Sequence, residues 1–161
     1  MTVPRLPQSF STGLPPEPGT YALLFTLPVA RELAIGALGG HVFSVGTYIY
    51  VGSALGAGGL HSRVAHHVRT ACRPHWHLDY LRPYTHVHAL WFSVYARRLE
   101  DVWAQTILAL DGATVPVPGF GASDRAGLSH LFHFTTTPLL VRFTERLGPT
   151  HPRVHCLRWA R

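Results

Sequence analysis

Two basic residues that could handle a phosphate, Arg63 and His67, follow a glycine-rich bend in the stretch YIYVGSALGAGGLHSRVAHHVR. Apolar residues recur every four positions there (Leu60, Val64, Val68), which predicts a helix over residues 59–70. At about 100° per residue, Arg63 and His67 share one margin of the apolar stripe. His66 lies further round, and Arg69 lies roughly opposite. Because a guanidinium suits phosphate oxygens, the pattern indicates either a phosphate site or a solvated basic edge of a helix.

A single carboxylate, Glu100, is placed to work beside such a site. It opens a segment whose residues repeat at helical spacing (Leu99, Val102, Trp103, Thr106, Ile107, Leu110), so we expect an amphipathic helix that packs on a sheet and ends at Gly112. Glu100 falls on the margin of the buried face, whereas Asp101 turns toward solvent. Only 8 acidic residues are present, which disfavours a paired-carboxylate hydrolase. One carboxylate with a hard divalent cation remains compatible with the sequence.

Two His-x-His pairs offer an alternative chemistry. His75 and His77 flank a tryptophan, and His86 and His88 flank a valine. Such pairs could ligate zinc, but no third and fourth ligand follow at a typical spacing. Polar, partly buried histidines are the favoured interpretation, and a zinc protein is the weaker one.

Composition narrows the choice of partner and compartment. The chain has 161 residues and a formal charge of +6, and all 14 of its basic Lys or Arg positions are Arg. The absence of lysine excludes a Walker A loop and a lysine Schiff base. The positive charge favours a polyanionic partner, although a solvated basic surface without such a partner would have the same net charge. Two cysteines, Cys72 and Cys156, form no disulfide framework, and no apolar run is long enough to span a membrane, so we expect a cytoplasmic protein.

The elements that must position these residues are predicted from periodicity. Residues 1–18 are rich in proline and predict a mobile arm. Buried strands follow in GTYALLFTL, TYIYVGSA, HVHALWFSVY and HLFHFT, with two shorter strands between the first two. A short helix is expected in HWHLDYL, and another helix should be capped by Thr137 with Pro138 in its first turn. We therefore predict an α+β (mixed α/β) domain over residues 19–136, then a C-terminal helix and basic tail over residues 137–161.

The ordered set of motifs resembles the GIY-YIG nucleases. The motifs are GTY at Gly19–Tyr21, YVG at Tyr50–Gly52, Arg63 with His67 four residues on, and Glu100 on a later helix. HWHLDYL, VPVPGFGASD and SHLFHF further resemble the stand-alone branch of that superfamily, long catalogued as a domain of unknown function and also found fused to endonuclease III-type repair enzymes. The resemblance covers roughly residues 18–136.

The resemblance implies a central, mostly antiparallel sheet with an inserted β-hairpin and about three flanking helices. It implies an endonuclease that hydrolyses DNA phosphodiester bonds with one Mg²⁺ or Mn²⁺ ion, on a structured or damaged substrate in DNA repair. Tyr21 or Tyr50 would help to deprotonate water, Arg63 would hold the scissile phosphate, His67 would orient or relay protons, and Glu100 would hold the metal. Further residues are expected to contact nucleic acid or support the site (His66, Arg69, His75, His77, Ser123, Asp124).

One departure from the family pattern keeps a second function open. Many GIY-YIG nucleases place an Asn late in the domain, and this chain has no Asn. Ser123 or Asp124 could take that role. Alternatively, the chain is a nucleic-acid-binding module of the same fold that is catalytically weak or inactive. A single domain of this kind would depend on a protein partner, on a homodimer or on substrate shape for its specificity.

Overall fold

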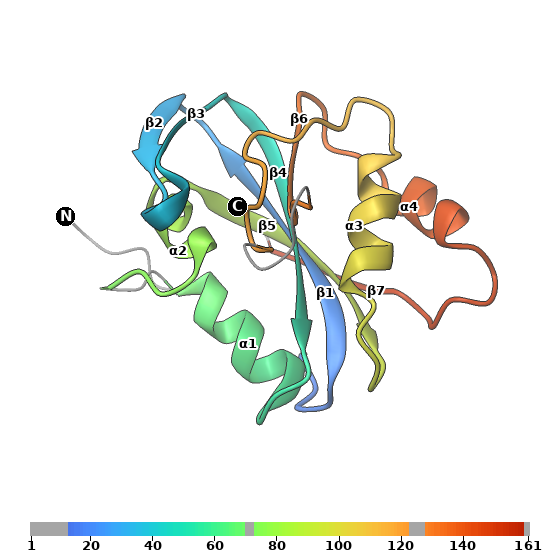
Figure 1. The fold of residues 1–161 in the computed structure, drawn as a ribbon. Coiled ribbons are helices and arrows are strands. Elements are labelled where there is room, and N and C mark those ends of the chain that lie inside the picture. The colour runs from blue at the N-terminus through green and yellow to red at the C-terminus, as the bar shows by residue number, and fades with distance from the viewer. Residues whose placement is uncertain (1–12, 70–72, 123–127, 160–161) are drawn as a thin grey trace.

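The centre of the protein is a five-stranded antiparallel sheet, seen in a computed structural model that describes residues 13–69, 73–122 and 128–159 (Figure 1). The strands lie in the order β6-β4-β1-β5-β7, with bounds β1 Gly19–Leu27, β4 Gly46–Ala54, β5 His86–Val94, β6 Leu131–Phe134 and β7 His155–Arg158. β1 pairs with both β4 and β5 and is the central strand. Because β1 and β4 are buried on both faces, their sequences are continuously apolar rather than alternating. The predicted α+β class and antiparallel sheet are confirmed.

A separate hairpin interrupts the chain between β1 and β4. It consists of β2 (Arg31–Ala34) and β3 (Gly40–Phe43), connected through a 3₁₀ turn at Gly36–Leu38. Gly39 ends this turn at φ 78°, a conformation that glycine adopts without strain. The hairpin is the predicted insertion, and it accounts for the long sequence gap between Tyr21 and Tyr50.

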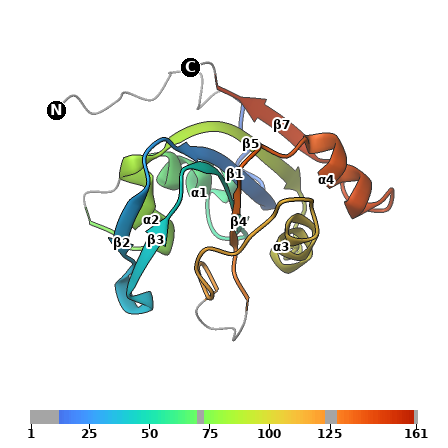
Figure 2. The same ribbon diagram turned by 90° about the horizontal axis from the view of Figure 1, so that it is seen from above.

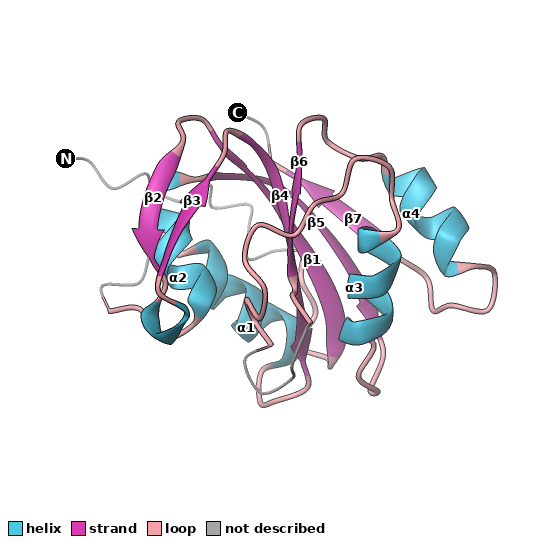
Figure 3. Ribbon diagram, turned by 45° about the horizontal axis from the view of Figure 1, so that its top comes forward, coloured by secondary structure: helices cyan, strands magenta, loops and turns pink. Residues whose placement is uncertain are grey.

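Four α-helices cover the two faces of the sheet, as Figures 2 and 3 show. On one face, α1 (Gly59–Val68) and α2 (His77–Leu81) pack on the side chains of Tyr21, Leu23 and Phe25. On the other, α3 (Glu100–Leu108) and α4 (Leu140–Leu147) pack on Ala22 and Leu24. Successive residues of β1 therefore alternate between two separate cores. Within the described residues, no helix has the length and apolar character needed to cross a membrane.

Two details of helices α3 and α4 differ from the predictions. Val102 is 49% exposed, because the buried stripe of α3 runs through Trp103, Ala104 and Ile107 instead. The prediction that Thr137 caps the last helix is wrong, since α4 begins at Leu140 and has no side-chain cap. The Thr137 hydroxyl instead lies 2.6 Å from that of Thr47, so it fastens the segment before α4 to the sheet.

Both ends of the described chain belong to the packed fold. Leu14 is buried, and the carbonyl oxygens of Pro15 and Glu17 accept hydrogen bonds from the start of α1. Residues 13–18, predicted as the end of a mobile arm, are therefore held to the fold through Leu14 and these two carbonyls, while residues 1–12 lie outside the described part. The predicted basic tail contains β7, which pairs with β5 at the edge of the sheet.

Candidate active site

The glycine-rich bend brings α1 close to the sheet. Gly58 and Gly59 have φ values of 80° and 51°, and a Cβ atom on Gly59 would collide with the carbonyl oxygens of Pro16 and Glu17. The carbonyl oxygens of Pro15 and Glu17 accept the amide protons of His61 and Leu60, at 3.1 and 3.0 Å. The amides at the start of α1 are thus satisfied by the chain itself. Any phosphate site here must be built from side chains rather than from the helix N-terminus.

The two tyrosines of the motifs lie side by side on the α1 face of the sheet. Tyr21 on β1 is paired with Gly52 on β4, and a Cβ atom on Gly52 would collide with the Tyr21 hydroxyl. Glycine at position 52 therefore gives the tyrosine ring room to lie across the neighbouring strand. Tyr50 is two residues earlier on β4 and faces the same side.

His67 is the histidine that meets both tyrosines. Its ring centroid lies 6.0 Å from that of Tyr21 and 5.4 Å from that of Tyr50, and its side chain is buried. Burial lowers the pKa of His67 to about 3, and the neighbouring His66 adds to the fall. His67 is consequently neutral near pH 7. His67 rather than His66 packs against the two tyrosines.

Arg63 and Glu100 complete the cleft. It has a volume of about 210 Å³ and is lined by residues of β1, β4, α1, α3 and three loops (Tyr21, Tyr50, Gly52, Ser53, Arg63, Trp76, Arg98, Glu100, Gly121, Ala122, His130). The Arg63 guanidinium stacks over the Trp76 ring, 4.6 Å from its centroid, which holds a flexible side chain in place. Four of the five predicted catalytic and metal-binding residues therefore line one cleft, and the fifth, His67, packs against its tyrosines.

The pKa values of the two tyrosines are raised in this cleft. Burial raises the pKa of Tyr21 well above the usual value near 10, with a contribution from Tyr50. Burial likewise raises the pKa of Tyr50, and the charge of Glu100 adds to the rise. Arg63 opposes the shift in both residues. Both tyrosines are therefore protonated near pH 7.

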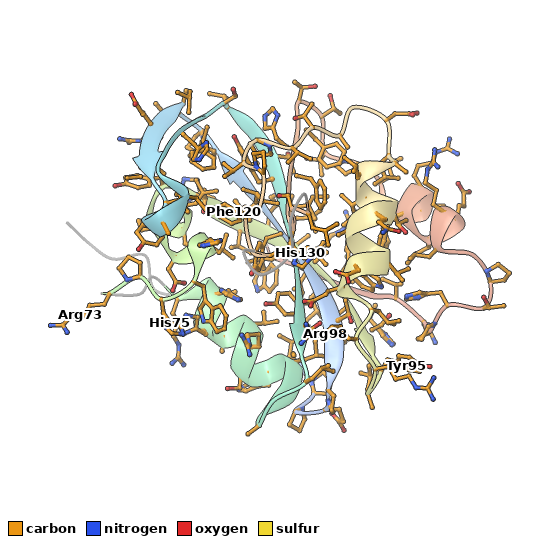
Figure 4. All side chains as sticks on the ribbon, in the orientation of Figure 1. Arg73, His75, Tyr95, Arg98, Phe120 and His130 are labelled. Carbon is orange, nitrogen blue, oxygen red and sulfur yellow. The ribbon has the colours of Figure 1, made fainter. Side chains whose placement is uncertain are left out.

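Arg98 and His130 were not predicted from the sequence. Arg98 Nη1 lies 2.8 Å from Glu100 Oε1, and Figure 4 shows Arg98 and His130 between α1 and α3. His130 Nε2 lies 3.4 Å from Asp101 Oδ1, so the Asp101 side chain, which is 36% exposed, faces solvent only in part and also contacts His130. Asp101 lies in the first turn of α3, and its carboxylate contacts His130, which directly precedes β6. The basic pair Arg97–Arg98 just before Glu100 was the available sequence signal for Arg98.

The remaining predicted residues lie outside the cleft or outside the described chain. Arg69 is exposed, and His66 lies beside Asp79 at the edge of the site. His75 is exposed, while His77 Nδ1 accepts the Gly121 amide at 2.9 Å. Among the described residues, no metal-binding group of three contains either His-x-His pair. Ser123 and Asp124 lie outside the described residues.

Arg82 supports the site through hydrogen bonds to the C-terminal end of α1. Its Nε donates to the carbonyl oxygen of His67 at 2.7 Å, its Nη2 to that of Val68 at 2.9 Å, and its Nη1 to the Thr85 hydroxyl at 2.7 Å. The guanidinium is buried, which lowers the pKa of Arg82 to about 10. It caps the last turn of α1 and so fixes the position of His67.

We expect Arg82→Met to lower the free energy of unfolding by about 3–5 kcal/mol, because each buried carbonyl left without a donor costs about 1–3 kcal/mol. Urea denaturation followed by circular dichroism measures the change. Arg146→Met on α4, at an exposed position, is the control and should change stability by no more than about 0.5 kcal/mol. Equal stability of the two variants would show that Arg82 does not hold α1 in place.

Comparison with known proteins relates the chain to one family. The sequence profile described as Domain of unknown function DUF123 matches residues 20–150. The matched span contains Tyr21, Tyr50, Arg63, His67 and Glu100. No curated protein and no solved structure matches the chain.

Proposed function

The chain belongs to the family Domain of unknown function DUF123, and from its cleft we propose that it is a divalent-metal-dependent nuclease of the GIY-YIG type that hydrolyses DNA phosphodiester bonds. The observation that supports this proposal most strongly is the convergence of two tyrosines, one arginine and one carboxylate on a single cleft from β1, β4, α1 and α3. These groups are what hydrolysis of a phosphodiester needs: a phosphate-binding cation, a base for water and an oxygen ligand for a metal.

Arg63 is assigned to the scissile phosphate. Its guanidinium lines the cleft and is held by Trp76, so it can offer a planar donor fork to two phosphate oxygens. Charge that develops on those oxygens in the transition state is offset by the same group. Neutral His67, packed against both tyrosines, orients them and can pass a proton between them and water.

Glu100 is assigned to a Mg²⁺ or Mn²⁺ ion. The donor chemistry fits, because a buried carboxylate lines the cleft and Mg²⁺ commonly takes one or two protein carboxylates and completes its shell with water and phosphate oxygens. A cleft of about 210 Å³ also has room for several waters at about 30 Å³ each. The bound ion would supply positive charge to the cleft and so favour deprotonation of a tyrosine or of water. In that state Arg98 would give up its contact with Glu100 Oε1 to the ion.

The rate of cleavage should rise about tenfold per pH unit from about pH 6 to about pH 9, because the pKa values of both tyrosines lie above this range and the deprotonated fraction grows with pH. Single-turnover cleavage of labelled DNA in Mg²⁺ measures this slope. Tyr21→Phe and Tyr50→Phe identify the base, since the variant that lacks it should lose the slope. A flat profile in the wild type would point instead to His67, whose pKa is about 3, and would contradict the tyrosine assignment.

A second candidate function is supported by the ion pair between Arg98 and Glu100. At 2.8 Å this pair neutralises the one carboxylate among the described residues that line the cleft and leaves Arg63 as their net charge, which suits a phosphate-binding module without turnover. The two functions differ in their response to Glu100→Gln. A nuclease should lose cleavage, whereas a binding module should bind DNA as well or better in the absence of metal.

A further inference from the structure

Three potential metal ligands meet behind the cleft, apart from Glu100. His66 and His67 come from α1 and Asp79 from α2, and one ligand atom from each residue lies within 4.8 Å of the other two. His66 Nε2 is 3.3 Å from Asp79 Oδ2. Two donor atoms bound to the same tetrahedral Zn²⁺ at about 2.0–2.1 Å are themselves about 3.3–3.4 Å apart. The pair is therefore already at the spacing that a tetrahedral ion requires.

Two atoms of this group are buried without a hydrogen-bond partner. They are His67 Nδ1 and Asp79 Oδ1, on residues that are 1% and 2% exposed. A buried polar atom without a partner costs about 1–3 kcal/mol. The other oxygen of Asp79 is well satisfied, since it accepts the amide protons of His75 and Trp76, each at 2.9 Å. Such bonds orient a carboxylate in the way that outer-shell groups orient metal ligands.

We propose that His66, His67 and Asp79 bind one divalent transition-metal ion of the Zn²⁺ class. Two imidazoles and one carboxylate suit zinc and its neighbours, whereas Mg²⁺ and Ca²⁺ prefer oxygen ligands alone. The set leaves a fourth position for water, as in catalytic rather than structural zinc sites. His67 can take part without leaving the tyrosines, because an imidazole has two nitrogens.

The ion has a route to the site from solvent. His66 has a side chain that is 40% exposed, and it lines a pocket of about 260 Å³ next to the cleft. The ligand atoms lie within 4.8 Å of one another and would draw together around an ion, while Asp79 is held in place by its two amides. Arg63 and Trp76 line both this pocket and the cleft that contains Glu100.

Titration of the full chain with Zn²⁺, without nucleic acid, tests the site by calorimetry, and Co²⁺ reports its geometry through visible absorption. We expect one Zn²⁺ per chain and a tetrahedral Co²⁺ spectrum. His66→Ala and Asp79→Asn should each weaken Zn²⁺ binding by more than about 10-fold to 100-fold, since even outer-shell groups have effects of that size. His75→Ala and Glu145→Gln are the controls and should leave Zn²⁺ binding unchanged.

Weak or non-stoichiometric Zn²⁺ binding by the wild type would overturn the site, and so would unchanged binding in His66→Ala. Asn at position 79 keeps an oxygen for the His75 and Trp76 amides, so Asp79→Asn should fold, and circular dichroism checks it. If Asp79→Asn unfolds, the Zn²⁺ affinity of His66→Ala alone tests the site. His66→Ala should fold, because that side chain is partly exposed and its described hydrogen bond is to the Asp79 side chain. The assay involves no DNA, so its outcome is independent of the proposed nuclease activity.

Discussion

Arg63→Ala is expected to slow single-turnover cleavage of DNA by about 10²–10³-fold, the usual cost of removing one donor that stabilises charge in a transition state. Arg63 lines the cleft with both tyrosines and Glu100, and the second arginine of the cleft, Arg98, is paired with Glu100. Arg63→Lys should recover only part of the rate, because an ammonium cannot form the two-pronged contact that a guanidinium makes with phosphate.

Arg69→Ala is the matched control for this effect. Arg69 follows α1 directly and is exposed, so its loss removes the same charge from the protein without touching the cleft. We expect a small loss of DNA affinity that disappears at higher salt, and no change in the single-turnover rate. Equal rates for Arg63→Ala and the wild type would show that Arg63 does not contact the reacting phosphate.

Glu100→Gln is expected to abolish Mg²⁺-dependent cleavage, with a loss of about 10³-fold, because the amide keeps the shape of the side chain and removes its charge. The Mg²⁺ concentration needed for half-maximal rate should rise in any residual activity. Glu145→Gln on α4, where the carboxylate is exposed and pairs only with Arg142 among the described residues, is the control. A variant with glutamine at position 100 that keeps both its rate and its Mg²⁺ dependence would place the metal elsewhere.

Much of this site could be predicted because it depends on local periodicity. Helical spacing alone placed Arg63 and His67 on one margin of α1. In the structure Arg63 lines the cleft, and His67 packs against a tyrosine that lines it. The need for glycine in the bend is also explained by the structure, since Gly58 and Gly59 adopt positive φ and Gly59 lies against the carbonyl oxygens of residues 16 and 17. Continuous apolar runs identified β1 and β4 because both faces of those strands are buried.

The parts that escaped prediction depend on contacts between distant segments. His66 meets Asp79 across 13 positions, and His130 meets Asp101 across 29, so no periodicity links the members of either pair. Asp101 was assigned to solvent because its helix was considered alone, without the segment before β6. Thr137 has the right residue type for a helix cap, yet its hydroxyl lies against Thr47, and α4 begins later. Local propensity was outweighed there by tertiary packing.

The most direct test is single-turnover cleavage by the wild-type chain of a labelled panel: duplex, single-stranded, nicked, flapped and branched DNA, with RNA alongside. Each substrate is incubated with Mg²⁺, with Mn²⁺ and with a chelator. The proposed function predicts cleavage of at least one DNA substrate that requires the metal and is lost in Arg63→Ala and Glu100→Gln. Binding of these substrates without cleavage in either metal would contradict it and establish the binding module in its place.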